Sequence, residues 1–338
     1  MTEIQEFLRR LPKAELHLHF EGTILPATLV ELSQRPGHQP LSLAEAEALY
    51  QYKDFLGFLQ AFKAVCNQLI TPEDYELAAW RMCEHLAEQG VVHAEVFISV
   101  GVIFRFREDG EAVFPAIFAG LERARLRAER ELGLSLYWIY DAVRNFTVEE
   151  ATKVFRAAAR MQAEYPTIIG IGLGGDEQHT SSEPYRELYA EAQAAGLRLT
   201  NHAGETTGPK AIREALSIGS ERLGHAYSAI QDAELMAELK RRQIALEMNP
   251  TSNVRTGVCL SFEEHPLRRC FEAGLLVTLN SDDPAFFGSD LLGEYEKAHH
   301  LQGFTRDELR QLASNSIRAS FLSAAEKSRW LAEIDSIQ

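Results

Sequence analysis

Apolar and polar positions along this chain follow two different patterns, which meet near residue 90. Between about residues 26 and 89 the apolar positions recur every three or four residues, as on one face of an amphipathic helix. After residue 90, short apolar runs alternate with longer amphipathic segments, which predicts strands that are each followed by a helix. Such strands are expected at about 91–98, 134–140, 168–173, 197–202, 222–225, 244–248 and 275–280.

One more strand is expected at about 14–20, before the helical region. Nearly continuous apolar runs are typical of parallel strands, and eight β/α units in 338 residues predict an α/β fold, a (β/α)8 TIM-type barrel. Residues 26–89 would then be a helical, lid-like insertion between strands one and two. An open doubly wound sheet is the alternative, but no G-x-G-x-x-G loop follows the first strand. We expect one domain over residues 1–338, because no linker, repeat or change of composition divides the chain.

The first strand carries an unusual set of polar positions. Strand alternation places Glu15, His17 and His19 on one face, with apolar side chains on the other. Two imidazoles on one face can bind one metal ion. Taken alone, however, two hydrogen-bonded structural histidines explain this run equally well.

Further histidines and carboxylates follow the later strands, and in a barrel all strand ends meet at one rim, where active sites lie. These side chains are His202 and Glu205 after strand five, His225 at strand six, and Asp282 and Asp283 after strand eight. Four residues form a nitrogen and oxygen donor set that suits zinc, although iron or cobalt would also fit: His17, His19, His202 and Asp282. One ion is expected, because strand four ends in Leu173-Gly174-Gly175 and lacks a bridging lysine.

The remaining polar groups have natural tasks at such a rim. Glu205 could donate a proton without being a ligand, and His225 could orient or deprotonate a water molecule held by the metal. The Gly174-Gly175 pair would let backbone N–H groups approach a flat ligand. Asp283 either hydrogen-bonds the substrate or is the Asp of an Asp-Pro turn.

Other charged residues receive structural or open interpretations. Asp176 and Glu177 are expected to be charges at a helix start, whereas the roles of Arg144 and Glu95 stay open. The other histidines are expected to be structural or exposed: His38, His85, His93, His179, His265, His299 and His300.

Composition narrows the classes of partner. The formal net charge is −15, and the chain has no basic patch interleaved with aromatic residues, which argues against nucleic acid and anionic membranes as partners. Four scattered cysteines indicate reduced thiols, and no secretion signal or membrane span is recognisable, so a cytoplasmic protein is expected.

Four motifs, in this order along the chain, resemble those of the adenosine/adenine deaminase family of the amidohydrolase superfamily. They are Pro12-Lys13-Ala14-Glu15-Leu16-His17-Leu18-His19, Asn201-His202-Ala203-Gly204-Glu205, Arg222-Leu223-Gly224-His225 and Asn280-Ser281-Asp282-Asp283-Pro284. The resemblance implies zinc-dependent hydrolytic deamination of a 6-aminopurine with release of ammonia. It also implies one Zn²⁺ per chain, with His17, His19, His202 and Asp282 as ligands.

The resemblance assigns a role to each of the other motif residues. Glu205 is similar to the family's proton donor to purine N1, and His225 to its base and hydroxide orienter. Asp283 resembles the residue that contacts purine N7, and Gly175 the backbone donor to N3. Protonation at N1 would make C6 electrophilic toward the attacking hydroxide.

Departures from the family pattern bear on the substrate. The adenosine deaminase pattern that this stretch resembles is His-x-His-x-Asp, whose Asp reaches the ribose 5′-hydroxyl. Glu21 stands at that position in this chain, and the Glu-Gly pair looks more like adenine deaminases. Gly174-Gly175-Asp176-Glu177 is instead similar to nucleoside-acting members. The blocks Asp54–Lys63 and Ser99–Ile103 look like a bacterial subgroup that acts on 6-aminodeoxyfutalosine, an adenosine with a large 5′ extension.

We therefore expect a 6-aminopurine nucleoside as substrate, with Glu21, Gly175 and Asp283 as substrate-binding residues and free adenine as the alternative. Another amidohydrolase that cleaves a cyclic amide or ester is disfavoured, because Glu205 is needed only where a ring nitrogen is protonated. A non-catalytic purine-binding module is disfavoured as well, since every ligand and proton-transfer residue is present. The oligomeric state stays open.

Overall fold

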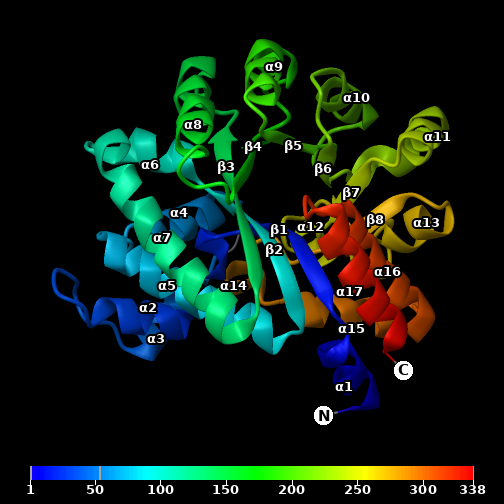
Figure 1. Cartoon of the computed structure of the whole chain (residues 1–338), viewed down its shortest axis with the longest axis horizontal. Coiled ribbons are helices and arrows are strands. Elements are labelled where there is room, and N and C mark those ends of the chain that lie inside the picture. The colour runs from blue at the N-terminus through cyan, green and yellow to red at the C-terminus, as the bar shows by residue number, and fades with distance from the viewer. Residues whose placement is uncertain (1, 53–54, 338) are drawn as a thin grey trace.

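The computed structural model describes residues 2–52 and 55–337, so Asp54, the first residue of one resembling block, lies outside the described part. Its eight parallel strands follow one another around a barrel in chain order, with helices outside (Figure 1). This confirms the predicted (β/α)8 fold class. The strands are β1 (Lys13–His19), β2 (Val91–Ile98), β3 (Ser135–Val143), β4 (Ile168–Gly174), β5 (Arg198–Ala203), β6 (Arg222–His225), β7 (Ala245–Met248) and β8 (Leu276–Leu279).

The barrel closes between its last strand and its first. Leu18 in β1 forms a parallel bridge with Asp282, which follows β8. The His19 N–H donates to the Asp282 carbonyl at 2.9 Å, and the Asp282 N–H donates to the His17 carbonyl at 3.1 Å. The closing hydrogen bonds are therefore made by three residues of the predicted metal site.

Helices connect and cover the strands. Before β2 they are α1 (Glu3–Arg10), α2 (Pro26–Ser33), α3 (Leu43–Ala48), α4 (Phe55–Cys66) and α5 (Pro72–Glu88), with the short 3-10 helix η1 (Glu21–Thr23) directly after β1. Between β2 and β6 they are α6 (Val100–Phe106), α7 (Gly110–Leu132), α8 (Val148–Met161), η2 (Glu183–Tyr185), α9 (Arg186–Ala194) and α10 (Pro209–Ser217). After β6 come η3 (Tyr227–Gln231), α11 (Ala233–Arg242), α12 (Pro250–Arg255), α13 (Leu267–Glu272), α14 (Pro284–Phe287), α15 (Leu291–Gln302), α16 (Arg306–Ala319) and α17 (Ala324–Ser336). No helix among the described residues is both long and apolar enough to cross a bilayer.

Local sequence signals explain where several of these helices begin. Thr71 caps α5, its hydroxyl accepts the Asp74 N–H, and the Asp74 carboxylate accepts the Thr71 N–H in return. Pro72 occupies the first turn of that helix, where its missing N–H costs nothing. Short helices directly after strands, such as α6, α12 and α14, were not predicted, because four to seven residues carry too little periodicity to be recognised.

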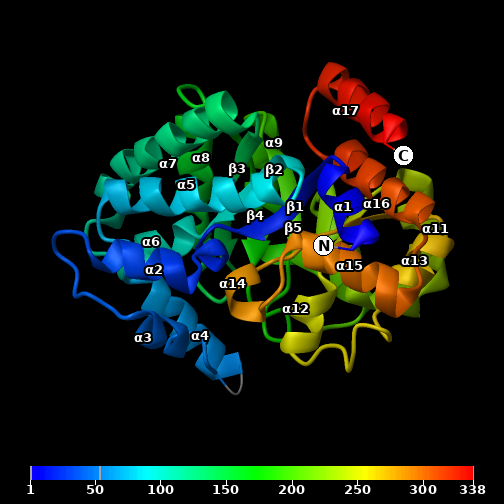
Figure 2. The same cartoon turned by 90° about the horizontal axis from the view of Figure 1, so that it is seen from below.

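The insertion between β1 and β2 lies beside the rim. Figure 2 shows α3 and α4 at one side of the molecule, with α14 next to them. In α4, the ring of Phe58 lies 5.6 Å from Phe286 and 5.5 Å from Phe287, which belong to the helix that follows Asp283. The insertion therefore packs against α14, the helix that directly follows Asp283 in the chain.

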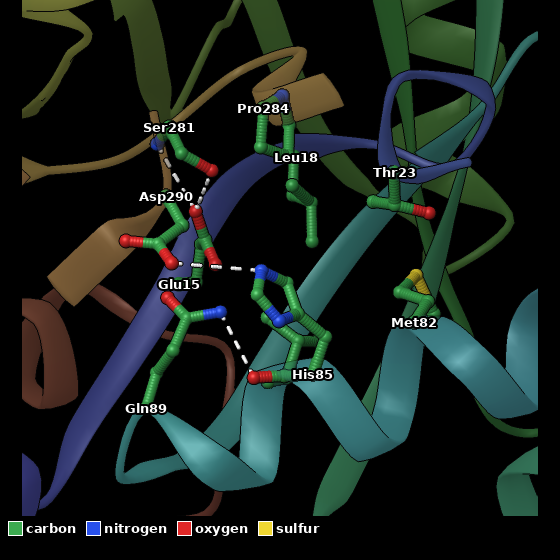
Figure 3. A pocket seen from close by; sticks show the side chains of 10 residues that line it. Glu15, Leu18, Thr23, Met82, His85, Gln89, Ser281, Pro284 and Asp290 are labelled. Carbon is green, nitrogen blue, oxygen red and sulfur yellow. Dashed lines mark hydrogen bonds and ion pairs between the residues drawn. The ribbon is translucent and has the colours of Figure 1, made fainter. Parts of the chain in front are cut away.

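One prediction about β1 is wrong. Glu15 does not share a face with His17, because three residue steps on β1, from Glu15 to Leu18, oppose only two on β2, and this bulge interrupts the alternation. Glu15 lines a small pocket with Leu18, His85 and Asp290, outside the metal site (Figure 3). There its carboxylate accepts the N–H of Ser281 at 3.0 Å and the Ser281 hydroxyl.

Candidate active site

The four predicted ligands converge where the barrel closes. His19 Nε2 lies 3.2 Å from His202 Nε2 and 3.4 Å from Asp282 Oδ1, and His17 Nε2 lies 3.6 Å from the same oxygen. Donor atoms held ~2.0–2.2 Å from a tetrahedral ion are roughly 3.3–3.6 Å apart, so these spacings fit a single small divalent ion.

The donor chemistry supports the same assignment. His17 Nε2 is buried and has no hydrogen-bond partner among the described residues, which is the state of an imidazole nitrogen that an ion would satisfy. Neutral imidazoles with one carboxylate suit zinc and its neighbours in the transition series. Two groups of residues each bring three potential ligand atoms within 4.8 Å of one another, and the groups share His17. The first is His17, His19 and His202, and the second is His17, His225 and Asp282.

Two of these residues have a backbone that ordinary side chains avoid. Asp282 has φ +66°, and His225 has φ +60° and is followed by Ala226 at φ +48°. Left-handed conformations cost free energy in residues other than glycine and persist where packing enforces them, commonly at functional sites. At both positions the chain turns sharply at a strand end, and this aims the side chain at the site.

The Nδ1 atom of His17 is held by a buried ion-pair network inside the barrel. It lies 2.8 Å from the Glu247 carboxylate of β7, which also accepts from Arg222 of β6. Arg222 in turn pairs with Glu95 of β2, whose role the sequence left open. A carboxylate at Nδ1 fixes the proton there and leaves Nε2 free for a metal ion.

Glu205 and His225 face the Asp282 side of the donor group. Glu205 Oε2 lies 3.7 Å from His225 Nε2, and His225 Nε2 lies 3.8 Å from Asp282 Oδ2. Within the described residues the Glu205 carboxylate accepts no hydrogen bond. Burial, and then the charges of Asp282 and Glu177, raise the pKa of Glu205 to about 8, so the group holds a proton at neutral pH.

The predicted substrate-binding residues lie around this centre. Asp283 is buried against Gly22, where an added Cβ would meet its Oδ1 at 2.1 Å, so a glycine at position 22 is needed for that carboxyl to fit. Glu21 accepts the Ser99 N–H at 3.0 Å and the Ser99 hydroxyl at 3.1 Å, which ties it to the end of β2. Gly175 has φ +100° and is exposed after β4.

Comparison with known proteins gives the family of this site. A family profile described as adenosine deaminase matches residues 12–337. The chain belongs to the adenosine deaminase family. It is 39% identical to an aminodeoxyfutalosine deaminase of Streptomyces avermitilis over 98% of this chain and 93% of that one.

Two solved structures share the fold of this family member. An adenine deaminase of Arthrobacter aurescens has a TM-score of 0.86 and 31% identity, covering 96% of this chain and 98% of that one. An amidohydrolase of Burkholderia ambifaria with bound Zn also has a TM-score of 0.86, with 27% identity, and covers 100% of this chain and 94% of that one. The protein is accordingly a hydrolytic aminohydrolase of the amidohydrolase superfamily, as predicted.

The sequence predicted that Glu177 of this deaminase is a charge at a helix start. This is wrong, because no helix starts at that position. Its buried carboxylate accepts the backbone N–H groups of Gly204, Glu205, Thr206 and Thr207 at 2.6–3.3 Å, and the Thr207 hydroxyl at 3.0 Å. It therefore holds the loop that carries Glu205. No sequence signal points to this role, since most of the donors are main-chain groups 27–30 residues away along the chain.

Asp141 and Arg144 of the deaminase also lie near the site. The Asp141 carboxyl, on β3, fills space left by Gly172 and Gly174, and a Cβ on Gly172 would meet its Oδ1 at 2.7 Å. Arg144 donates to the His202 carbonyl at 2.5 Å and to the Asn201 side-chain oxygen at 2.9 Å, which anchors β5 at the ligand. Asp141 was not recognised from the sequence, although the strand predicted at 134–140 places it directly at a strand end, where the other site residues lie.

Proposed function

We propose that this protein catalyses zinc-dependent hydrolytic deamination of a 6-aminopurine nucleoside, either adenosine or a 5′-modified adenosine such as 6-aminodeoxyfutalosine. The products would be the 6-oxo purine nucleoside and ammonia. The observation that carries the proposal is the placement of Glu205, a carboxyl that accepts no hydrogen bond among the described residues, at the same rim as a four-residue metal donor set.

The metal site has a defined place in this proposal. His17, His19, His202 and Asp282 would hold one Zn²⁺, which as a Lewis acid lowers the pKa of a bound water towards about 7. Ser252 donates its hydroxyl to Asp282 Oδ2 at 2.6 Å, so one carboxylate oxygen is fixed by the protein while the other faces the histidines.

The proton chemistry falls to this chain's own residues. Glu205 would give its proton to purine N1, which draws electron density from C6 and makes that carbon open to attack by water. His225 Nε2 lies on the Asp282 side of Glu205 and would hydrogen-bond the oxygen that adds to C6. The water that adds to C6 gives up both protons, one back to the Glu205 carboxylate and one to the exocyclic nitrogen, which leaves as ammonia when the C6–N bond breaks.

The purine would be held from two sides. Burial, and then the neighbouring charge of Asp282, raise the pKa of Asp283 well above its ordinary value, so this carboxyl would carry the proton that purine N7 accepts. The exposed backbone after β4 at Gly175 would donate to N3, as the resemblance implies. Glu21 would face the 5′ side of the sugar.

Free adenine is the second candidate. It is favoured by the Glu21-Gly22 pair and by similarity to the adenine deaminase of Arthrobacter aurescens. The nucleoside is favoured by Gly174-Gly175-Asp176-Glu177, by the Ser99–Ile103 block that bonds Glu21, and by similarity to the aminodeoxyfutalosine deaminase of Streptomyces avermitilis.

The test is ammonia release by the purified protein, whose metal content is measured in parallel. The substrates are adenine, adenosine, 5′-substituted adenosines and aminodeoxyfutalosine, at equal concentrations. We expect the highest kcat/KM with a 5′-modified adenosine. Highest kcat/KM with adenine would replace the nucleoside by the free base, and no ammonia from any of them would contradict the proposed function.

A further inference from the structure

A row of buried polar groups leads away from His225 toward the start of α13. It consists of Asn253 in α12, His265, and the main chain of Leu267. The sequence predicted only a structural role for His265. The hydrogen bonds along this row nevertheless determine where His225 carries its proton.

The row starts with a backbone N–H group, which can donate a hydrogen bond but cannot accept one. The main-chain N–H of Leu267 donates to His265 Nδ1 at 3.2 Å. A nitrogen that accepts a hydrogen bond carries no hydrogen, so the proton of the neutral ring is on Nε2. Burial, and then the nearby His225, lower the pKa of His265 to about 3, which keeps that ring neutral.

The next step fixes an amide. His265 Nε2 lies 3.1 Å from Asn253 Oδ1 and, as the protonated nitrogen, donates to it. The Asn253 NH₂ group therefore points the other way, toward His225, and its Nδ2 lies 3.1 Å from His225 Nδ1. The Nδ2 of Asn249 approaches the same ring nitrogen at 3.4 Å.

His225 thus receives the Asn253 amide donor at Nδ1, which places its own proton on Nε2. That nitrogen faces Glu205 at 3.7 Å and Asp282 at 3.8 Å. The arrangement is opposite to that at His17, whose Nδ1 meets the Glu247 carboxylate, an acceptor that places the proton on Nδ1. An amide donor and a carboxylate acceptor at the same ring atom specify opposite tautomers.

We infer that Asn253 and His265 are positioning residues that hold His225 in its Nε2–H tautomer, so that His225 acts at the site as a hydrogen-bond donor and not as a base. The inference rests on the proposed function only for the identity of the oxygen that receives this hydrogen bond. It decides between the two roles, orienting or deprotonating water, that the sequence left open for His225.

The direct test is nuclear magnetic resonance of the metal-loaded protein labelled with ¹⁵N-histidine. Long-range ¹H–¹⁵N spectra distinguish a protonated from an unprotonated ring nitrogen, and the His225 signals are assigned by their loss in His225→Asn. We expect protonated Nε2 and unprotonated Nδ1 for both His225 and His265. A proton on Nδ1 of His225 would overturn the inference, whatever substrate the enzyme uses.

A variant that reverses the polarity gives a second test. In Asn253→Asp the new carboxylate can only accept, so it should draw the His225 proton to Nδ1. Loss of one preorganised donor to a developing oxyanion typically costs about 10²- to 10³-fold in kcat. We expect a fall of that size, with KM and metal content changed less than about threefold.

The matched pair at His265 separates positioning from packing. His265→Gln keeps a donor and an acceptor on one flat group and should retain the Nε2–H tautomer of His225, whereas His265→Leu keeps only bulk and should give a mixture of tautomers. Wild-type kcat in Asn253→Asp, or an unmixed tautomer in His265→Leu, would contradict the inference. Absence of deamination with every purine would instead contradict the proposed function and leave the tautomer measurement intact.

Discussion

The loops after β4 and β5 each carry one glutamate, and the two carboxyl groups experience opposite surroundings. Glu177, in the first loop, accepts four backbone N–H groups and one hydroxyl. Glu205, in the second loop, accepts no hydrogen bond within the described residues, and 18% of its side chain is exposed. The carboxylate of the first loop thus supports the main chain of the second.

The difference shows how one residue type serves two tasks at one rim. The donors around Glu177 tie its carboxylate to the main chain of the neighbouring loop. A desolvated carboxyl beside other acids keeps its proton, which is why the pKa of Glu205 rises to about 8. The charge on Glu177 contributes to that rise, so the supporting residue also helps to keep the proton on the residue it supports.

The largest effect is expected from Glu205→Gln, which removes the transferable proton but keeps the shape of the side chain. General acid catalysis contributes typically ~10²- to 10⁴-fold, and we expect kcat for ammonia release to fall by that amount. Metal content should stay near wild type, and so should thermal unfolding at about pH 5, where Glu205 of the wild type still keeps its proton. The exposed Glu187→Gln is the matched control, and wild-type turnover in Glu205→Gln would refute the proton-donor role.

Glu177→Ala should affect both stability and turnover. It leaves four backbone N–H groups without their acceptor, and unmade bonds to a charged partner cost about 2–4 kcal/mol in the free energy of unfolding. A displaced Glu205 loop should also lower kcat by ~10- to 100-fold. Urea unfolding and steady-state kinetics measure the two effects.

The control for Glu177→Ala is Asp176→Asn. Among the described residues, the carboxylate of the neighbouring Asp176 bonds only Gln178 and His179 within its own turn, so this change should alter neither quantity appreciably. Equal effects of the two substitutions would mean that Glu177 does not support the Glu205 loop.

The raised pKa of Glu205 predicts a pH dependence of stability in the metal-free protein. Between pH 4.5 and about 8 the folded chain keeps a proton that the unfolded chain releases, so the stability of the wild type falls as the pH rises through this window. Glu205→Gln lacks this loss. Between pH 5 and pH 8.5 its free energy of unfolding should therefore rise relative to that of the wild type by roughly 2–4 kcal/mol, since one pKa unit is worth about 1.4 kcal/mol. Urea titrations at pH 5 and pH 8.5 measure it, and a constant difference would show that Glu205 is not protonated.

Glu21 offers a case between the two glutamates and should give the smallest effect. It accepts two hydrogen bonds from Ser99, yet burial raises its pKa to about 7. We expect Glu21→Asp to change the ratio of kcat/KM for 5′-modified adenosine over adenosine by about 3- to 10-fold, with little change for adenine. Ser99→Ala, which keeps the backbone donor, should shift the same ratio less, and equal changes for all three substrates would exclude a role at the 5′ side.

The sequence alone determined the eight-stranded barrel, because apolar runs and amphipathic helices alternate along the chain, and it placed the polar residues at the ends of strands. It also predicted the group formed by His17, His19, His202 and Asp282, since parallel strand ends meet at one rim. Only the tertiary structure decided which groups surround them. The bulge in β1 that turns Glu15 away depends on pairing with β2.

The same holds for the hydrogen bonds that tune the site. Glu177 acts on main-chain groups of another loop, and the tautomer of His225 follows from an N–H at Leu267. Neither has a signature in residue type or spacing, because a backbone donor is present at nearly every residue and only folding selects which one is used. The chemistry of this rim is therefore set by residue type, whereas the protonation of each group is set by its neighbours in three dimensions.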